Sequence, residues 1–411
     1  MVYDLIIIGA GAGGCFTAIR LAEFQPGARI CILEAARKPL SKVEISGGGR
    51  CNVTHASFDP EKLITYYPRG REELLSPFNE FQPSDLISWF KEKGIKLKTE
   101  ADGRMFPVTD RSSTIIDCFM QEMKRHKIQL WTSTRCTDWQ YSKDEQRWII
   151  NLPDDRVLTA KYLLIASGSD QRIWSSLSSL GHTIVSPVPS LFTFNIRDKT
   201  LQDLMGISKA NVHLSIPSLK MDATGPLLIT HWGMSGPAIL RLSAWGAREL
   251  YDCGYVFDLK VNWMPDQALE ATQSFLQKLI NENPKRKIIK LVVQDFPARL
   301  WKYLCDKAGI TEFMSGAEFG KKQMKQMLDV LTNDVYRVTG KSTFKEEFVT
   351  AGGVEVSQID FKKFESRIQP GLFLVGEVLN IDAITGGFNF QAAWTGAHIA
   401  AKAIAKGLNN N

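Results

Sequence analysis

The sequence has little of what would place a protein in a specialised class. Its 411 residues include only seven cysteines and no C-x-x-C pair, so we expect reduced thiols in the cytoplasm rather than a disulfide framework. The six histidines and the cysteines nowhere show the spacing of a metal-ligand set. No apolar run reaches the roughly 18 residues that a membrane span requires. These absences predict a cytoplasmic protein without a metal site and without a membrane partner.

Charge of either sign is also modest. The 50 basic and 44 acidic residues give a net charge of +6 and a pI of about 8.8. This balance permits anionic ligands but falls short of a nucleic-acid-binding signature. The densest basic group, Lys285 to Lys287, is expected on a solvated helix face. The length predicts two or three domains, because a single core rarely extends over so many residues.

A dinucleotide-binding pattern opens the chain. A short apolar run, Leu5 to Ile8, suits a strand buried on both faces, and the glycines that follow fit G-x-G-x-x-G through Gly9, Gly11 and Gly14. Helical spacing of apolar residues and a second strand come next, and that strand ends in Glu34. Such glycines allow a tight turn, close approach of a pyrophosphate and close helix packing, while the acid binds a ribose. The pattern predicts a Rossmann fold that binds either FAD or NAD.

The end of the chain carries a second glycine-rich pattern. An apolar strand over 372–375 stops at Gly376 and Glu377, and a loop then leads to Gly386 and Gly387 before a long helix that ends near Lys406. A simple turn before a helix would also account for the two glycines. The combination resembles the second FAD motif of the glutathione-reductase-type flavoproteins. That resemblance implies FAD, with Glu377 on its ribityl chain and the helix start, Gly386 to Asn389, at its pyrimidine ring.

More specifically, the chain resembles the bacterial BaiN-like, or aminoacetone-oxidase-like, NAD(P)/FAD-dependent oxidoreductases. The matching segments are GAGAGG, KVEISGGGRCNVT, DGRMFP, THWGMSGPAIL, VTAGGVEV and GEVLNIDAITGGFNFQAAWTGAHIA. The resemblance implies an α/β fold whose Rossmann-type FAD-binding domain is built from both chain ends. Together with the β and helical patterning of the middle, it predicts FAD-binding parts at 1–187 and 346–411. Between them we expect a β-rich domain at 188–264, returning at 331–345, and a small helical domain at 265–330.

The family resemblance also places a glycine run against the cofactor. The segment from Lys42 to Asn52 would lie near the ribityl chain and the isoalloxazine ring, where Cβ atoms would clash, and Arg50 would supply a positive charge. A mobile surface loop is the alternative. Cys51 has no neighbouring cysteine, so it is interpreted as a small packing residue and not as half of a redox disulfide.

Together, the motifs and the resemblance give one set of predicted FAD-binding residues. These are Gly9, Gly11, Ala12, Gly13, Gly14, Glu34, Ala35, Lys42, Ser46, Gly47, Gly48, Gly49, Arg50, Cys51, Asn52, Cys136, Ala166, Ser167, Gly168, Gly376, Glu377, Asp382, Gly386, Gly387, Phe388 and Asn389.

Two residues in other matching segments have two interpretations each. His231 could act on the substrate as an acid or base, or it could be hydrogen-bonded to hold a β-to-helix turn, which we favour. Arg104 could bind an anionic substrate, or it could simply follow an exposed hairpin turn at Asp102 and Gly103. No catalytic residue is therefore assigned.

The predicted activity is that of an FAD-dependent oxidoreductase acting on a small molecule by hydride transfer through flavin N5. Two directions are open, an NAD(P)H-dependent reductase and an amine-type oxidase that uses oxygen. No second G-x-G-x-x-G lies between residues 35 and 345, so NAD(P)H would bind transiently, which slightly favours an oxidase. A flavin-bound RNA-modifying or RNA-binding protein is the alternative, although no RNA-binding module is visible and nucleic acid is not the expected partner. A flavoprotein with a purely structural or sensory role is a third possibility.

Overall fold

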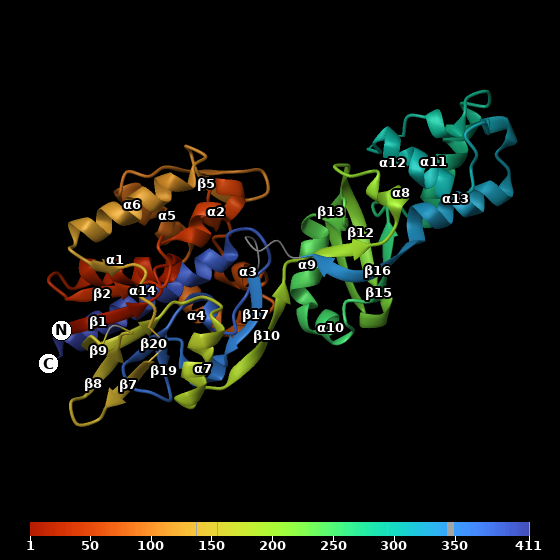
Figure 1. Cartoon of the computed structure of the whole chain (residues 1–411). Helices are drawn as coiled ribbons and strands as arrows, with labels where there is room; N and C mark the ends of the chain where they lie inside the picture. Colours follow the sequence, from red (N-terminus) through yellow and green to blue (C-terminus); the bar gives the residue numbers. More distant parts are fainter. Residues whose placement is uncertain (137, 154, 294, 343–348, 411) are drawn as a thin grey trace. The chain divides into compact units, whose positions relative to one another are not determined.

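The protein divides into two compact units. The structure is a computed structural model that describes residues 1–136, 138–153, 155–293, 295–342 and 349–410. Unit 1 consists of Met1–Val188 and Val349–Asn411, and unit 2 consists of Pro189–Phe348 (Figure 1). The predicted domain boundary between residues 345 and 346 lies outside the described residues. A separate helical domain within the insertion stays a prediction.

Five parallel strands form the centre of unit 1. Their spatial order is β6 (Gln129–Trp131), β2 (Ile30–Leu33), β1 (Val2–Ile8), β9 (Val157–Ile165) and β20 (Leu372–Leu374). The sheet continues antiparallel through β19 (Glu365–Ser366) and β18 (Ile359–Asp360), and the hairpin β7 (Asp138–Ser142) and β8 (Arg147–Asn151) adds to β9. The almost continuous burial of β1 and β2 is typical of strands covered on both faces. The predicted Rossmann-type α/β fold is confirmed.

The first and last helices of the chain pack together over this sheet. They are α1 (Ala12–Phe24) and α14 (Phe388–Asn409), drawn in red and blue in Figure 1. Phe16 of α1 meets Trp394 of α14 edge to face, with ring centroids 5.4 Å apart, and Phe119 of α6 (Ser112–Arg125) stacks on the same indole at 5.5 Å. These aromatic contacts tie the two chain ends into one core.

The remaining elements of unit 1 are five helices, a small sheet and a further strand pair. The helices are α2 (Ser41–Gly49), α3 (Pro60–Ile64), α4 (Arg71–Glu80), α5 (Pro83–Glu92) and α7 (Gln171–Ser179). A small antiparallel sheet joins β3 (Thr54–His55), β5 (Arg104–Pro107) and β4 (Leu97–Thr99), and β10 (Ile184–Ser190) pairs with β17 (Val349–Val354). The turn between β4 and β5 contains Asp102 and Gly103, whose φ is 85°, so the predicted hairpin turn is confirmed.

Unit 2 is a closed antiparallel barrel with helices attached. The barrel order is β11 (Thr193–Ile196), β14 (Gly233–Ser235), β13 (Met221–Thr230), β12 (Ser208–Ile216), β15 (Phe257–Asn262) and β16 (Asp334–Ser342). Its helices are α8 (Lys199–Gln202), α9 (Pro237–Trp245), α10 (Ala247–Asp252), α11 (Leu269–Asn281), α12 (Ala298–Lys307) and α13 (Lys321–Asn333). One hydrophobic core includes residues of both the barrel and the helices. The expectation that Lys285 to Lys287 lie on a helix was wrong, because α11 ends before them and they occupy a turn.

Candidate FAD site

The glycine turn after β1 is built by backbone contacts that exclude side chains. Gly9 has a φ of 104°, and a Cβ atom there would lie 2.5 Å from the carbonyl oxygen of Ala166, the residue after β9. A Cβ on Gly14 would lie 2.0 Å from the carbonyl oxygen of Gly9. Both positions therefore require glycine, and they bring the start of α1 against the end of β9.

The amino-terminal end of α1 is free to bind an anion. Its cap residue, Gly11, offers no side-chain hydrogen bond, and its first turn holds no acidic residue. The first hydrogen bond within the helix runs from the Cys15 N–H to the Gly11 carbonyl, so the N–H groups of Ala12, Gly13 and Gly14 have no partner within the helix. Unpaired N–H groups and the positive end of the helix dipole suit the pyrophosphate of a dinucleotide.

Glu34 is held beside this turn at the end of β2. Its Oε2 accepts a hydrogen bond from the Ala10 N–H and its Oε1 accepts one from the Ala36 N–H, both at 2.7 Å. Each oxygen keeps a second lone pair that could accept from a ribose hydroxyl. The predicted neighbour Ala35 lies between these contacts and is exposed.

A second cluster forms where β9 and β20 end. The ammonium of Lys42, on α2, contacts Oε2 of Glu377, and the N–H of Thr350 donates to Oε1 of the same carboxylate at 3.0 Å. A Cβ built on Gly168, whose φ is 65°, would lie 3.6 Å from that Oε2 and 3.9 Å from the Lys42 Nζ. The side chain of Glu377 is 18% exposed and that of Lys42 is 57% exposed, so the pair borders solvent. Ser167 precedes Gly168 in the same loop.

The start of α14 is fixed by neighbouring backbone and amide groups. Gly387 caps the helix with a φ of 90°, and a Cβ there would lie 2.7 Å from the carbonyl oxygen of Thr54. In the orientation that satisfies its amide, Asn52 accepts from the Gly387 N–H at 3.0 Å and donates to the Thr54 carbonyl at 3.0 Å. Asn389 holds the preceding loop through two hydrogen bonds to the backbone of Ala383. No acidic residue lies in the first turn, so this helix end can also stabilise negative charge.

The glycine run that begins at Gly47 serves two purposes. Ser46, Gly47 and Gly48 break α2, and a Cβ on Gly47 would lie 2.8 Å from the ring of Phe106. A Cβ on Gly48 or Gly49 would meet nothing within 4 Å, although both have positive φ values. Gly47 therefore permits close packing, while the next two glycines line open space into which a ligand could approach.

Several predicted binding residues are occupied by contacts within the protein. Arg50 pairs with Glu100 at 2.6 Å and lies over Phe106, 4.0 Å from the ring centroid. Cys51 is buried with a φ of 62°, and burial raises the pKa of its thiol to about 12, so the thiol is protonated at neutral pH and suits a packing role. The thiol of Cys136 is buried and lies against the carbonyls of Asp138 and Asn151.

Asp382 is joined to a residue that the sequence reasoning missed. Its carboxylate is fully buried, and Arg69 donates to both of its oxygens through Nε and a terminal nitrogen. Arg69 could not be found from spacing, because the two residues lie 313 positions apart. Phe388, also predicted, is buried and stacks on Tyr66 and His55, with centroids 4.3 and 4.6 Å away.

The two ambiguous residues have surface positions. Arg104 pairs with Asp102 at 2.7 Å and with Glu100 at 3.3 Å, so its guanidinium is shared between two acids of its own hairpin. His231, in unit 2, is exposed and packs against the ring of Trp232. Within the described residues no hydrogen bond holds the His231 side chain, so the predicted hydrogen bond across the turn is not found.

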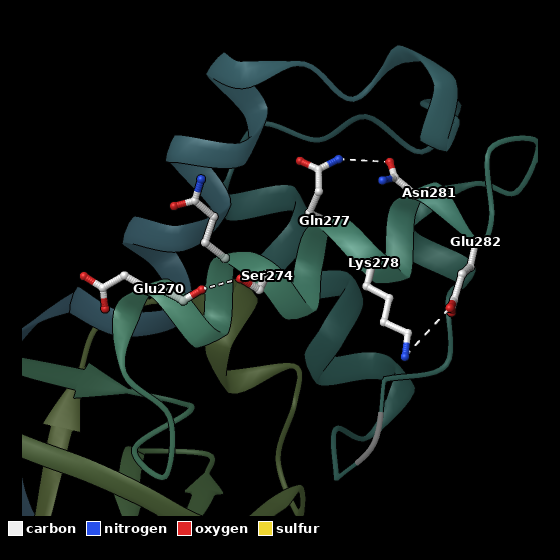
Figure 2. Close-up of a pocket in the computed structure, with 7 residues that line it drawn as sticks. Glu270, Ser274, Gln277, Lys278, Asn281 and Glu282 are labelled. Atoms are coloured by element: carbon white, nitrogen blue, oxygen red, sulfur yellow. Dashed lines mark hydrogen bonds and ion pairs between the residues drawn. The ribbon is translucent and has the colours of Figure 1, made fainter.

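Neither a cluster of potential metal ligands nor a polar surface depression has the features of a second active site. Glu23, Glu122 and His126 lie close together, but the ammonium of Lys93 bridges the two carboxylates at 2.6 and 2.7 Å. The depression in Figure 2 is lined by α11 and the next residue alone, with side chains such as Gln277 bonded along the same helix. Among the residues that the structure describes, no second element contributes a converging group there.

The residues around the carboxyl edge of the parallel sheet fit FAD. The parallel strands β1, β2, β9 and β20 are each followed by one of the candidate binding residues above. The helices α1 and α14 begin beside these residues, and neither has an acidic residue in its first turn. Ligands of doubly wound α/β proteins bind at this edge, where the strand order reverses. The glycine positions leave space for a dinucleotide, while Glu34 and Glu377 can accept from its hydroxyl groups. The fold and the site define an FAD-dependent oxidoreductase of the Rossmann type.

Comparison with known proteins identifies the family. The chain belongs to the HI0933-like protein Rossmann domain family, whose model matches residues 3–403. It is 26% identical over 412 residues to a 3-dehydro-bile acid delta(4,6)-reductase of Clostridium scindens, covering 97% of this chain and 98% of that one. It is 27% identical over 414 residues to a ribosomal RNA dihydrouridine synthase of Escherichia coli, with 97% of both chains covered. The predicted family resemblance is confirmed.

Solved structures show the same fold at low sequence identity. A 3-ketosteroid-delta4-(5alpha)-dehydrogenase from Rhodococcus jostii superposes with a TM-score of 0.53 and 12% identity, covering 98% of this chain and 97% of that one. The open conformation of a flavocytochrome c3 fumarate reductase gives a TM-score of 0.51 and 14% identity, covering 98% and 78%. Within the described part of the chain, no helix is both long enough and apolar enough to cross a membrane.

Proposed function

We propose that this protein is a reductase of carbon–carbon double bonds conjugated with a carbonyl group. The names of its full-length relatives support this reaction class. A 3-dehydro-bile acid delta(4,6)-reductase reduces ring double bonds of an oxo compound, and a dihydrouridine synthase saturates the ring double bond of a uracil, which is also conjugated with a carbonyl. The two substrates differ greatly in size, but the bond that is reduced has the same electronic character in both.

The proposed reaction is a balanced addition of a hydride and a proton. When bound and reduced, FAD supplies the hydride and its electron pair. The β-carbon of the substrate accepts this hydride and the α-carbon accepts a proton from a protein group or water, so the double bond becomes a single bond. A reduced nicotinamide is the proposed source of the electron pair in each turnover. Because no second glycine fingerprint follows the first, it would bind transiently.

The amino-terminal end of α14 is the observation that carries the proposal. The first hydrogen bond within the helix runs from the Gln391 N–H to the Gly387 carbonyl, so the N–H groups of Phe388, Asn389 and Phe390 have no partner within the helix. With no acidic residue in the first turn and with Gly387 fixed in position, this end provides a preorganised positive charge at the cofactor edge. Such an end stabilises the negative charge of a reduced flavin and thereby favours storage of electrons for reduction. Glu377 would hold the ribityl chain, with Lys42 balancing the charge of its carboxylate.

A small cyclic enone is the first candidate substrate, and a uridine within RNA is the second. The second candidate is favoured by the two relatives named ribosomal RNA dihydrouridine synthase, each aligned over 97–98% of this chain. Both candidates require the same FAD site.

An anaerobic two-step experiment tests the reaction class. The purified protein is first titrated with NADPH or NADH while the visible flavin absorption is followed, and the reduced protein is then mixed with an acceptor. We expect bleaching in the first step and recovery of absorption with a 3-oxo steroid that has a ring double bond, or with a uridine-containing RNA, but not with the saturated ketone. Reduction by an amine in place of a nicotinamide, with peroxide formed in air, would replace the proposal with an oxidase.

A further inference from the structure

Two segments at the surface of unit 2 are joined into a single platform. Residues 284–290 and 313–317, here called the basic platform, are linked by backbone hydrogen bonds. The Ile288 N–H donates to the Met314 carbonyl at 3.0 Å, and the Gly316 N–H donates to the Arg286 carbonyl at 3.1 Å. The Ala317 N–H donates to the Pro284 carbonyl at 2.9 Å. These bonds fix the first segment against the second, so their side chains form one surface.

The basic platform carries positive charge without compensation. It contains Lys285, Arg286, Lys287 and Lys290 and no acidic residue. Among the residues that the structure describes, none of these four cations pairs with a carboxylate. The nearest acids along the chain are Glu282, which pairs with Lys278, the exposed Asp295 and Glu312, and Glu318, which accepts from the N–H and hydroxyl of Ser315. Four such cations attract a chain of phosphates.

An exposed aromatic ring lies beside one of these cations. Phe313 is 70% exposed, and the Nζ of Lys287 lies 4.7 Å from the centroid of its ring. Proteins that bind single-stranded nucleic acid combine exposed rings, which stack on bases, with a basic surface that binds the phosphates. A membrane-binding surface would be expected to expose several apolar side chains, because such binding increases with the apolar area that is buried in the lipid.

We propose that the basic platform binds RNA, with Lys285, Arg286, Lys287 and Lys290 on phosphates and Phe313 stacked on an unpaired base. The choice of RNA as the partner rests on the second candidate substrate given above. The proposal gives a function to four cations that do not belong to the FAD site. In this proposal the basic platform binds the RNA, and the flavin reduces the uracil base.

The experiment measures RNA affinity of the full-length FAD-loaded protein by fluorescence anisotropy, with a labelled ribosomal RNA hairpin that has uridines in its loop. One variant replaces all four cations with glutamine, and a second is Phe313→Ala. The matched control replaces Lys321, Lys322 and Lys325 of α13, which are exposed, with glutamine. We expect the fourfold variant to lose at least tenfold in affinity and to flatten the slope of log affinity against log salt by about 3, as four lost phosphate contacts imply. Phe313→Ala should lose about fivefold or more, in keeping with the loss of one stacked base.

Three results would overturn the proposal. They are an absence of RNA binding by the unaltered protein, equal losses in the α13 control, and binding to vesicles of anionic lipid that displaces the RNA. Flavin content and bleaching by NADPH report separately on the FAD site and should be unchanged in every variant. If RNA binds at the platform but reduced protein does not saturate its uridines, the second candidate substrate fails while the binding surface stands.

Discussion

The ammonium of Lys42 contacts the carboxylate of Glu377, although 335 positions separate them in the chain. Lys42 lies on the helix that leads into the glycine run, and Glu377 follows β20. The Thr350 N–H donates to the other carboxylate oxygen, and Gly168 leaves space next to the pair. The contact joins segments from the beginning, middle and end of unit 1 at one edge of the sheet, where the FAD is expected.

Removing the Glu377 carboxylate should weaken FAD binding. Loss of a charged hydrogen bond to a ligand hydroxyl typically costs about 1.5–3 kcal/mol, so we expect Glu377→Ala to raise the dissociation constant for FAD by about 10–100-fold. Titration of the apoprotein with FAD, followed by flavin fluorescence, gives this number. The control is Glu80→Ala, which removes the exposed Lys402–Glu80 pair outside the predicted FAD-binding residues and should leave FAD affinity within a factor of about two. An unchanged affinity in a folded Glu377→Ala protein contradicts the assignment.

Alanine at Gly9 and at Gly11 should have different effects. At Gly9 the new Cβ would lie 2.5 Å from a backbone oxygen and the φ is positive, so the apoprotein should unfold at lower temperature or fail to fold. At Gly11 the φ is −82° and the nearest atom would be 4.0 Å away, so the fold should survive. The methyl group of Gly11→Ala would instead occupy the approach of the pyrophosphate and reduce FAD affinity. Thermal melting of the two apoprotein variants measures the loss of stability, and FAD titration of the Gly11→Ala protein measures the loss of affinity. Equal melting temperatures for Gly9→Ala and Gly11→Ala would argue against the geometry of the turn.

The buried pair of Arg69 and Asp382 should be important for stability. Removing one partner of a buried ion pair leaves the other charge buried without compensation, which costs about 3–5 kcal/mol. Arg69→Met should therefore lower the free energy of unfolding by about this amount. Urea denaturation measures the change. Lys402→Met is the matched control, because it breaks the exposed pair with Glu80 and should cost less than about 1 kcal/mol. Similar losses in both variants would show that the Arg69 pair is not special.

The stability of unit 1 should decrease in acid because of His398. Burial, with smaller effects of Arg20 and Lys402, lowers the pKa of this histidine to about 3 in the folded protein. Below about pH 6.5 the unfolded chain therefore binds a proton that the folded chain does not, and stability falls progressively until about pH 3. His398→Phe, which retains a ring against Phe81, should flatten the decline of melting temperature between pH 6.5 and pH 4. His213→Gln, at a half-exposed position on the barrel, should keep the decline of the unaltered protein; the same slope in His398→Phe would refute this explanation.

The sequence predicted the elements that depend on local patterns. The buried strand before Gly9, the acid after β2 and the helix that begins after Gly387 all follow from apolar periodicity and from glycines at fixed spacing. These features could be identified because the physical demand lies within a short segment.

Contacts between distant segments could not be derived in this way. The pairing of Arg69 with Asp382, and the approach of Thr54 to Gly387, depend on how loops return over the sheet. Local composition also misplaced Lys285 to Lys287 on a helix, because α11 ends before them and a tertiary bridge at Lys287 fixes the turn. A charged cluster has no periodicity that distinguishes a helix face from a turn.

The cofactor content of the purified protein shows whether the carboxyl edge of the sheet binds FAD. The protein is expressed, purified and denatured by heat, and the released chromophore is identified by chromatography and quantified against protein concentration. The site described here predicts a yellow protein that releases one FAD per chain, or a colourless one that takes up one equivalent of added FAD. A protein that contains no flavin and does not bind added FAD would contradict the account.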